Sequence, residues 1–209
     1  MNKHLTDYIE AHILPCYESY DAAHRRDHIE GVIERSLHLA THYPEVNRSM
    51  VYTIAAYHDL GLPEGRATHH LSSGRLLAED KRLLEWFSKE EIQTMREAVE
   101  DHRASATEAP RTIYGKIVAE ADRQIVPEVV VRRTIQYGLS HYPDLTREEH
   151  WERTLGHLHE KYDYGGYLQL HIPHSDNAAR LEELRALIAN RPALRELFES
   201  IYGELKAES

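Results

Sequence analysis

Residues 46–61, VNRSMVYTIAAYHDLG, decide the fold of this chain. Apolar residues recur in this stretch at three- and four-residue spacing, which is the period of an amphipathic helix, and His58 continues the same face. An imidazole followed by the Asp59 carboxylate, both directed into a helical interior, makes little sense as packing but supplies two ligands for one divalent metal. The sequence therefore predicts a helix over 46–60 that ends on a metal site. The apolar stripe consists of Met50, Val51, Ile54 and Ala55.

Helical periodicity continues along the rest of the chain. Eight prolines separate stretches that repeat every three to four residues and do not alternate with period two. The sequence predicts an all-α fold, a compact helical bundle built as a single domain over residues 1–209. Within it we expect a metal-binding core over 21–126 and extra C-terminal helices over 140–209. The expected helices cover 4–14, 22–42, 46–60, 68–87, 89–103, 112–126, 128–141, 146–162, 176–190 and 192–206.

Ligand-type side chains also lie on the predicted buried faces of three other helices. Asp122 lies in the middle of an apolar face, where an unpaired carboxylate is costly or takes up a proton. His28 borders a second apolar stripe and His102 extends a third. Taken singly, each histidine could be a hydrogen-bonded core residue, and Asp122 could cap a helix or pair with Arg123 or Arg133. Together with the adjacent histidine and aspartate described above, they indicate a metal site.

Composition excludes several classes of function. The 209 residues carry a net charge of -10, which opposes non-specific attraction to nucleic acid or to an anionic membrane. A single cysteine, Cys16, excludes an internal disulfide and a cysteine-rich zinc cluster. The N-terminus lacks the features of a signal peptide, and the sequence has no apolar run of membrane-spanning length. We therefore expect a cytoplasmic protein that binds neither nucleic acid nor membrane.

Five phrases of the sequence resemble the HD superfamily of metal-dependent phosphohydrolases, over about residues 21–125. They are DAAHRRDHIEGVIERSLHLA, AAYHDLG, HHLSSGRLL, AVEDHRAS and GKIVAEADRQI. The resemblance implies a bundle of the HD-domain type around the ion, and Asp59 is further implied to orient the attacking water. The implied metal ligands are His28, His58, Asp59 and Asp122.

The same resemblance raises the question of a second metal. Some branches of the superfamily carry two further histidines between the HD pair and the last aspartate. His69 fits the first of these, because two small residues follow four and five positions later and a leucine follows eight positions later. His70 is its adjacent alternative, and His102 fits the second. His69 and His102 could instead bind substrate or only form hydrogen bonds. The sequence therefore does not decide whether the site holds one ion or two.

The chain departs from a common family pattern at the residue after Gly61. Many members have a lysine there that can meet a phosphate, whereas this sequence has Leu62. Arg66, Arg103 or Lys116 can take its place. The substrate of lysine-bearing relatives therefore does not transfer directly to this chain.

The expected chemistry is hydrolysis of a phosphoester or phosphoanhydride in a nucleotide or another small phosphorylated metabolite. The ion would be Mn²⁺, Fe²⁺, Mg²⁺ or another divalent metal. Arg103 is the first candidate for binding the phosphate, since a guanidinium makes a planar, bidentate match, although a surface ion pair is its alternative. His24, one turn before His28, could bind substrate, transfer a proton or support its neighbour. Glu64 is a weaker general-acid candidate.

Two other functions compete with hydrolysis, namely a di-iron HD-type oxygenase and a non-catalytic nucleotide-binding sensor. A homodimer formed through the outer helices is also compatible with the sequence. The aromatic, glycine-containing segment 161–175 interrupts the helical pattern. It could be a loop, a short hairpin, a flap or a tyrosine-rich connector packed on the bundle.

Overall fold

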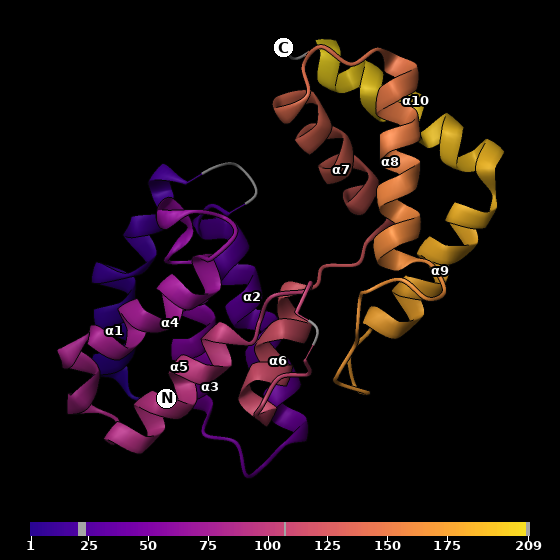
Figure 1. The fold of residues 1–209 in the computed structure, drawn as a ribbon. Coiled ribbons are helices and arrows are strands. Elements are labelled where there is room, and N and C mark those ends of the chain that lie inside the picture. Colours follow the sequence, from indigo (N-terminus) through magenta and orange to yellow (C-terminus); the bar gives the residue numbers. More distant parts are fainter. Residues whose placement is uncertain (21–23, 107, 208–209) are drawn as a thin grey trace. The chain divides into compact units, whose positions relative to one another are not determined.

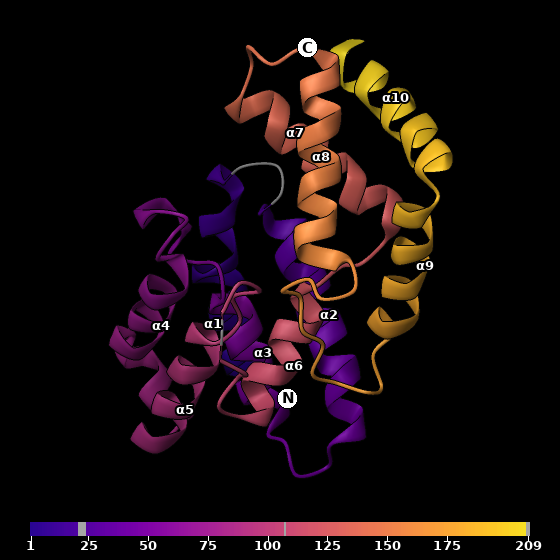
Figure 2. The same ribbon diagram turned by 45° about the vertical axis from the view of Figure 1, so that its right-hand side comes forward.

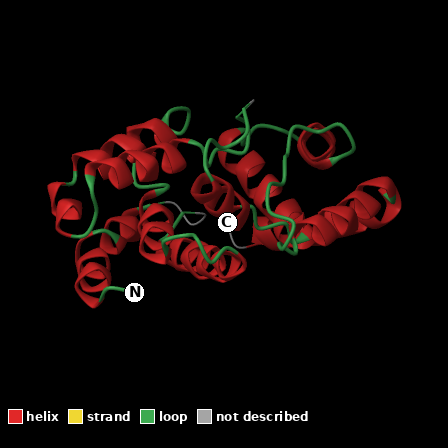
Figure 3. Cartoon of the chain, turned by 90° about the horizontal axis from the view of Figure 1, so that it is seen from below, coloured by secondary structure: helices red, strands yellow, loops and turns green. Residues whose placement is uncertain are grey.

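The computed structural model describes residues 1–20, 24–106 and 108–207, and in these residues it contains helices and loops but no strand (Figure 3). The described chain forms two compact units. Unit 1 comprises the described residues of 1–123 together with 171–175, and unit 2 comprises 124–170 and the described residues from 176 onwards. The all-α prediction is confirmed.

Unit 1 is built around one central helix, α3 (Arg48–Tyr57), which packs against α2, α4, α5 and α6 (Figure 1). Every residue from Met50 to Tyr57 is buried, as expected for a helix that is surrounded on all sides. The other elements of unit 1 are α1 (Lys3–His12), η1 (Leu14–Ser19), α2 (Arg26–Leu39), η2 (Ala40–His42), η3 (Leu62–Glu64), α4 (His69–Glu79), η4 (Lys81–Glu85), α5 (Lys89–Glu100) and α6 (Ile113–Asp122).

Short polar side chains set the starts of three of the helices that carry or precede the candidate ligands. The Asn47 side chain accepts a hydrogen bond from the backbone N–H of Ser49 and starts α3. Ser88 and Glu91 form a capping box at the start of α5. Thr112 accepts from the backbone of Gly115 and starts α6. The starts of these three helices are therefore set by local sequence.

Unit 2 contains four helices that pack on one another (Figure 2). A second capping box, between Thr146 and Glu149, starts helix α8. Trp151 and Phe198 meet edge to face in its core, with their ring centroids 5.4 Å apart. The helices are α7 (Pro127–His141), α8 (Arg147–Tyr162), α9 (Asn177–Ala189) and α10 (Arg191–Ala207).

The segment 161–175 contains no strand, so the hairpin alternative is wrong. Helix α8 continues to Tyr162, and the rest is a loop whose last residues belong to unit 1. The buried carboxylate of Glu120 accepts hydrogen bonds from the backbone N–H groups of His171, at 2.7 Å, and Ile172, at 3.4 Å. Ile172 joins the apolar core of unit 1. This end of the segment is thus anchored on α6.

Several predicted helix bounds need correction. The helix predicted over 22–42 begins at Arg26 in the structure, and residues 21–23, including Asp21, lie outside the described residues. The helix predicted over 68–87 is divided into α4 and η4, because the Asp80 side chain accepts from the backbone N–H of Arg82 and starts a new turn. The helix predicted over 46–60 ends at Tyr57, since the residues that follow form a turn. The single domain over 1–209 stays a prediction.

Within the described chain, no helix combines the length and apolar character that crossing a lipid bilayer would require.

Candidate metal centre

The ends of five helices of unit 1 meet around the Asp59 carboxylate. His58 is the C-terminal cap of α3 and Asp59 follows it in the turn. Helix α2 contributes His28 from its first turn, and Asp122 is the last residue of α6. Four predicted ligands from three helices are therefore brought together.

The first group of atoms surrounds the Nε2 atoms of His28 and His58. The Nε2 atom of His28 lies 3.2 Å from Asp122 Oδ1 and 4.0 Å from Asp59 Oδ2. The Nε2 atom of His58 lies 3.3 Å from Asp59 Oδ2 and 3.7 Å from Asp122 Oδ1. Both nitrogens are buried without a hydrogen-bond partner despite these nearby oxygens. Lone pairs that converge without forming hydrogen bonds fit a shared cation.

A second group lies on the other oxygen of the same carboxylate. Asp59 Oδ1 is 3.2 Å from His69 Nε2 and 3.4 Å from His102 Nε2. These two nitrogens are themselves 3.1 Å apart. His69 comes from the first residue of α4 and His102 from just beyond the end of α5. Asp59 therefore belongs to two groups of candidate ligands, His28–His58–Asp59 and Asp59–His69–His102.

Backbone carbonyl groups fix the orientation of three of the imidazole rings. The Nδ1 atoms of His58, His69 and His102 lie 2.8, 2.8 and 2.6 Å from the carbonyl oxygens three residues earlier. A carbonyl only accepts, so Nδ1 carries the proton in each ring and the neutral ring has a lone pair on Nε2. Two lone pairs facing each other at 3.1 Å repel unless positive charge lies between them. The donor set thus fits a metal at this second position as well.

The pKa shifts of Asp59 and His58 also indicate that the cluster favours a positive charge at its centre. Burial acts to raise the pKa of Asp59, but the imidazoles of His58, His102 and His69 outweigh it and hold that pKa well below its ordinary value. Burial acts to lower the pKa of His58, but the carboxylates of Asp59 and Asp122 raise it well above its ordinary value. In the protein without metal, protons therefore supply the charge that a cation would supply.

Gly61 allows the turn after Asp59 to lie close to the first turns of α4. A side-chain carbon at this position would lie 2.5 Å from the backbone nitrogen of Ser73 and 2.6 Å from the carbonyl oxygen of His69. The Gly61 N–H donates instead to Ser73 Oγ at 2.8 Å. Ser73 and Gly74 are the two small residues noted after His69, and Gly74 likewise leaves room for the Glu100 side chain. The spacing HHLSSGRLL thus places the first turn of α4 against the turn after Asp59.

Other predicted site residues lie at the edge of this cluster. The His24 ring stands edge-on to His28, with ring centroids 6.0 Å apart. The Nη1 atom of Arg103 donates to the carbonyl of Ala67 at 2.5 Å, so the guanidinium lies against the loop that precedes α4. Glu64 accepts from Arg75 in an exposed ion pair. The catalytic roles of His24, Arg103 and Asp59 stay predictions.

Sequence reasoning missed three side chains that hold the backbone beside the ligands. Tyr17 donates to the Ala56 carbonyl at 2.8 Å, and Tyr20 donates to the Leu60 carbonyl at 2.7 Å. The Nε atom of Arg35 donates to the Ala121 carbonyl, next to Asp122, at 2.7 Å. No local pattern could have identified them, because each acts on a carbonyl group that is distant in sequence.

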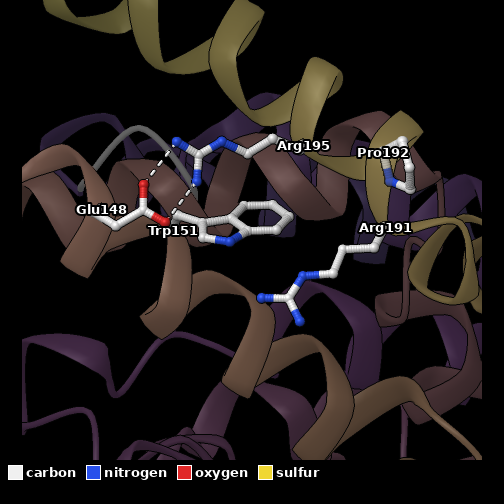
Figure 4. Close-up of a pocket in the computed structure, with 5 residues that line it drawn as sticks. All are labelled: Glu148, Trp151, Arg191, Pro192 and Arg195. Carbon is white, nitrogen blue, oxygen red and sulfur yellow. Dashed lines mark hydrogen bonds and ion pairs between the residues drawn. The ribbon is translucent and has the colours of Figure 1, made fainter.

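Unit 2 has a surface pocket of about 540 Å³, and none of the candidate metal ligands lines it (Figure 4). Two arginines lie beside the Trp151 indole, and Arg195 also forms a two-point ion pair with Glu148. Arg191 pairs with Glu152 at 3.3 Å. These pairs neutralise the positive charge, so the pocket is no evident site for a phosphate. Its lining residues are Glu148, Trp151, Arg191, Pro192 and Arg195.

Residues 25–124 match the model of the HD domain family. The resemblance to the HD superfamily noted in the sequence is confirmed over these residues, which form an HD domain. Among solved structures, it is similar to a predicted HD superfamily hydrolase from an uncultured Thermotogales bacterium, with a TM-score of 0.51 and 22% identity. That similarity covers 72% of this chain and 84% of the other, and it shows a shared fold. No curated protein matches the chain.

Proposed function

We propose that the chain hydrolyses a phosphoester or phosphoanhydride of a small phosphorylated metabolite, such as a nucleotide, with two divalent metal ions. The proposal depends on one observation, the division of the Asp59 carboxylate between two histidine pairs. Its Oδ2 atom faces His28 and His58, and its Oδ1 atom faces His69 and His102. A carboxylate shared between two groups of nitrogen donors suits a pair of neighbouring ions.

The donor set also limits the choice of metal. Mixed imidazole and carboxylate ligands suit Mn²⁺ or Fe²⁺ better than Mg²⁺, which prefers oxygen ligands and keeps its waters. Such ions, when bound, lower the pKa of water toward neutrality and withdraw charge from phosphorus. The first ion would be held by His28, His58, Asp59 and Asp122, and the second by Asp59, His69 and His102.

Exposure of the ligand side chains indicates the side from which substrate enters. The Asp122 side chain is 27% exposed and that of His69 is 13% exposed, whereas the other ligand side chains are at most 7% exposed. Substrate would therefore approach between Asp122 and His69, with water excluded from the opposite side. His24, beside His28, would transfer a proton, and Arg103, adjacent to His102, would bind a phosphate oxygen.

A di-iron oxygenase is the second candidate, because six nitrogen and oxygen ligands, one of them a shared carboxylate, also suit two irons. The two functions differ in their need for oxygen. An oxygenase consumes O₂ and requires iron, whereas a hydrolase turns over anaerobically with Mn²⁺.

The deciding experiment is an anaerobic assay of the metal-depleted full chain after it is reloaded with Mn²⁺ or Fe²⁺. Nucleoside monophosphates, nucleoside polyphosphates and other small phosphoesters form the panel, and release of phosphate or of the dephosphorylated product is measured. We expect turnover that depends on the metal and that Asp59→Ala abolishes while the helical circular dichroism signal persists. Undiminished turnover by Asp59→Ala, or oxygen consumption in place of hydrolysis, contradicts the proposal.

A further inference from the structure

The turn that carries His58 and Asp59 is fastened on both sides by tyrosines from another part of the chain. Tyr17 is fully buried, and its hydroxyl donates to the Ala56 carbonyl at 2.8 Å, two residues before His58. Tyr20 donates to the Leu60 carbonyl at 2.7 Å, one residue after Asp59.

The end of α3 makes the first of these hydrogen bonds necessary. The last carbonyl groups of a helix have no partner within it, and a buried carbonyl without a donor is unfavourable. Ala56 is fully buried, so solvent does not reach this part of the helix. The Tyr17 hydroxyl supplies the donor that neither the backbone nor water supplies.

One other bond leaves the turn, from the Gly61 N–H to Ser73 Oγ on α4. The other bonds of the turn are local and fix only its internal shape. The Ala55 carbonyl is bound by the His58 ring, at 2.8 Å. The Leu60 N–H donates to the Tyr57 carbonyl at 3.1 Å, and the Leu62 N–H donates to the Asp59 carbonyl at 3.0 Å. Bonds of this kind move with the turn. The tyrosines, like the Gly61–Ser73 bond, join the turn to another segment, in their case to η1 and to the residue that follows it, and therefore help to fix where the turn lies.

We propose that Tyr17 and Tyr20 are positioning residues of the metal centre, which hold the His58–Asp59 turn where the Asp59 carboxylate reaches both histidine pairs. The inference rests on the proposed function, in that the site is taken to bind metal. Both tyrosines precede residues 25–124, so they lie outside the part of the chain that matches the HD domain model. They also support each other, because their rings meet edge to face with centroids 5.0 Å apart.

The variants Tyr17→Phe and Tyr20→Phe remove only the hydroxyl and keep the packed ring. Each variant leaves one carbonyl group of the turn without its hydrogen-bond donor. The turn would then move to a position where another donor can reach that carbonyl group. A small shift matters at Asp59 because its two oxygens face different partners at 3.2 to 3.4 Å. We expect the dissociation constant for metal to rise about 10-fold or more, the range for loss of groups that support ligands.

The test is a titration of the metal-free full chain with Co²⁺, whose visible absorption reports ligand geometry directly and needs no substrate. Tyr8→Phe is the matched control. Its hydroxyl, on helix α1, donates to the Asp80 carboxylate at 2.7 Å and not to a carbonyl group of the His58–Asp59 turn, and Tyr57 still binds the same carboxylate in the variant. We expect weaker Co²⁺ binding and an altered spectrum for the Tyr17 and Tyr20 variants, and wild-type binding for Tyr8→Phe.

Wild-type affinity and an unchanged spectrum in both variants would overturn the inference, and so would an equal loss in Tyr8→Phe, which would indicate general loosening. If Tyr17→Phe does not fold, Tyr20→Phe decides alone, because that tyrosine is only partly buried. If the wild-type chain binds no Co²⁺, the proposed function itself fails. That result is distinct from a wild-type chain that binds metal while the variants bind it equally well.

Discussion

At the scale of single residues, the candidate centre depends on how each ligand is held. The His102 ring is 3% exposed, and the Val99 carbonyl fixes its Nδ1 atom, so Nε2 has one available direction. That direction leads to His69 and Asp59. A residue so constrained serves one position of the cluster and cannot replace a ligand of the other group.

His102→Gln therefore tests the second metal position. The amide keeps most of the volume of the imidazole but cannot offer the same nitrogen lone pair, so the metal content should fall from two ions to one per chain. Elemental analysis after equilibration with Mn²⁺ measures the change. His70→Gln is the control, because His70 is the neighbouring histidine and is absent from both ligand groups. Retention of two ions by His102→Gln would remove this histidine from the ligand set.

His150, in unit 2, should make the stability of the protein sensitive to acid. The residue is 1% exposed and neither ring nitrogen has a hydrogen-bond partner. Burial lowers its pKa, and Arg153 and Lys206 lower it further against the weaker influence of Glu149. The unfolded chain then takes up this proton first, so stability is complete above about pH 6.5 and is lost as the pH falls below it.

Replacing His150 by Leu should remove this acid sensitivity and the unpaired nitrogens together. We expect a gain of about 1 kcal/mol in the free energy of unfolding near neutral pH, and a larger gain at pH 5.5. Urea unfolding of both proteins at pH 7.5 and 5.5 provides the measurement. A difference between the two proteins that stays constant with pH would show that this histidine does not titrate on unfolding.

At the scale of elements, local patterns predicted the helices, and contacts between distant segments decided the rest. The apolar stripe that ends at His58 was sufficient to place α3 in the interior. The break between α4 and η4 was not predictable, because Asp80 also accepts hydrogen bonds from Tyr8 and Tyr57 on two other elements. The hydrogen bond of the Tyr17 hydroxyl was not predictable for the same reason, since its partner is a backbone atom 39 residues away.

Gly61 is the position where close approach of two elements should be most sensitive to substitution. In Gly61→Ala the new methyl group would meet backbone atoms of Ser73 and His69 at 2.5 and 2.6 Å, and backbone yields less readily than a side chain. We expect a loss of about 1–3 kcal/mol in stability and weaker binding of the second ion, because α4 must move away from the Asp59 turn.

Urea unfolding and Mn²⁺ stoichiometry measure the two effects, and Gly156→Ala is the control. Nothing lies within 4 Å of the added methyl group at Gly156 in helix α8, so alanine there should raise stability by about 0.5–1 kcal/mol. A Gly61→Ala protein as stable as wild type, with two ions bound, would show that α4 does not depend on this close approach.

At the scale of the whole molecule, the ligands and the helices that follow the family match belong to different units. All six candidate ligands lie in unit 1, and the HD domain match ends at residue 124, next to the boundary at 123. Helices α7 to α10 therefore contribute no ligand to either group among the described residues.

Metal binding should accordingly protect one unit far more than the other. At a free metal concentration of about 100 times the dissociation constant, binding stabilises the folded protein by about 2.7 kcal/mol, and this gain enters through the helices that hold the ligands. Hydrogen exchange, compared with and without Mn²⁺, should show slower exchange in peptides from α2 to α6 and little change in peptides from α8 and α10. The Asp59→Ala protein, treated identically, controls for non-specific effects of the ion and should show no change in either unit. Equal protection of α8 and α10 in the wild type would mean that the two units open as one cooperative structure, and the predicted single domain over 1–209 would then hold in thermodynamic terms.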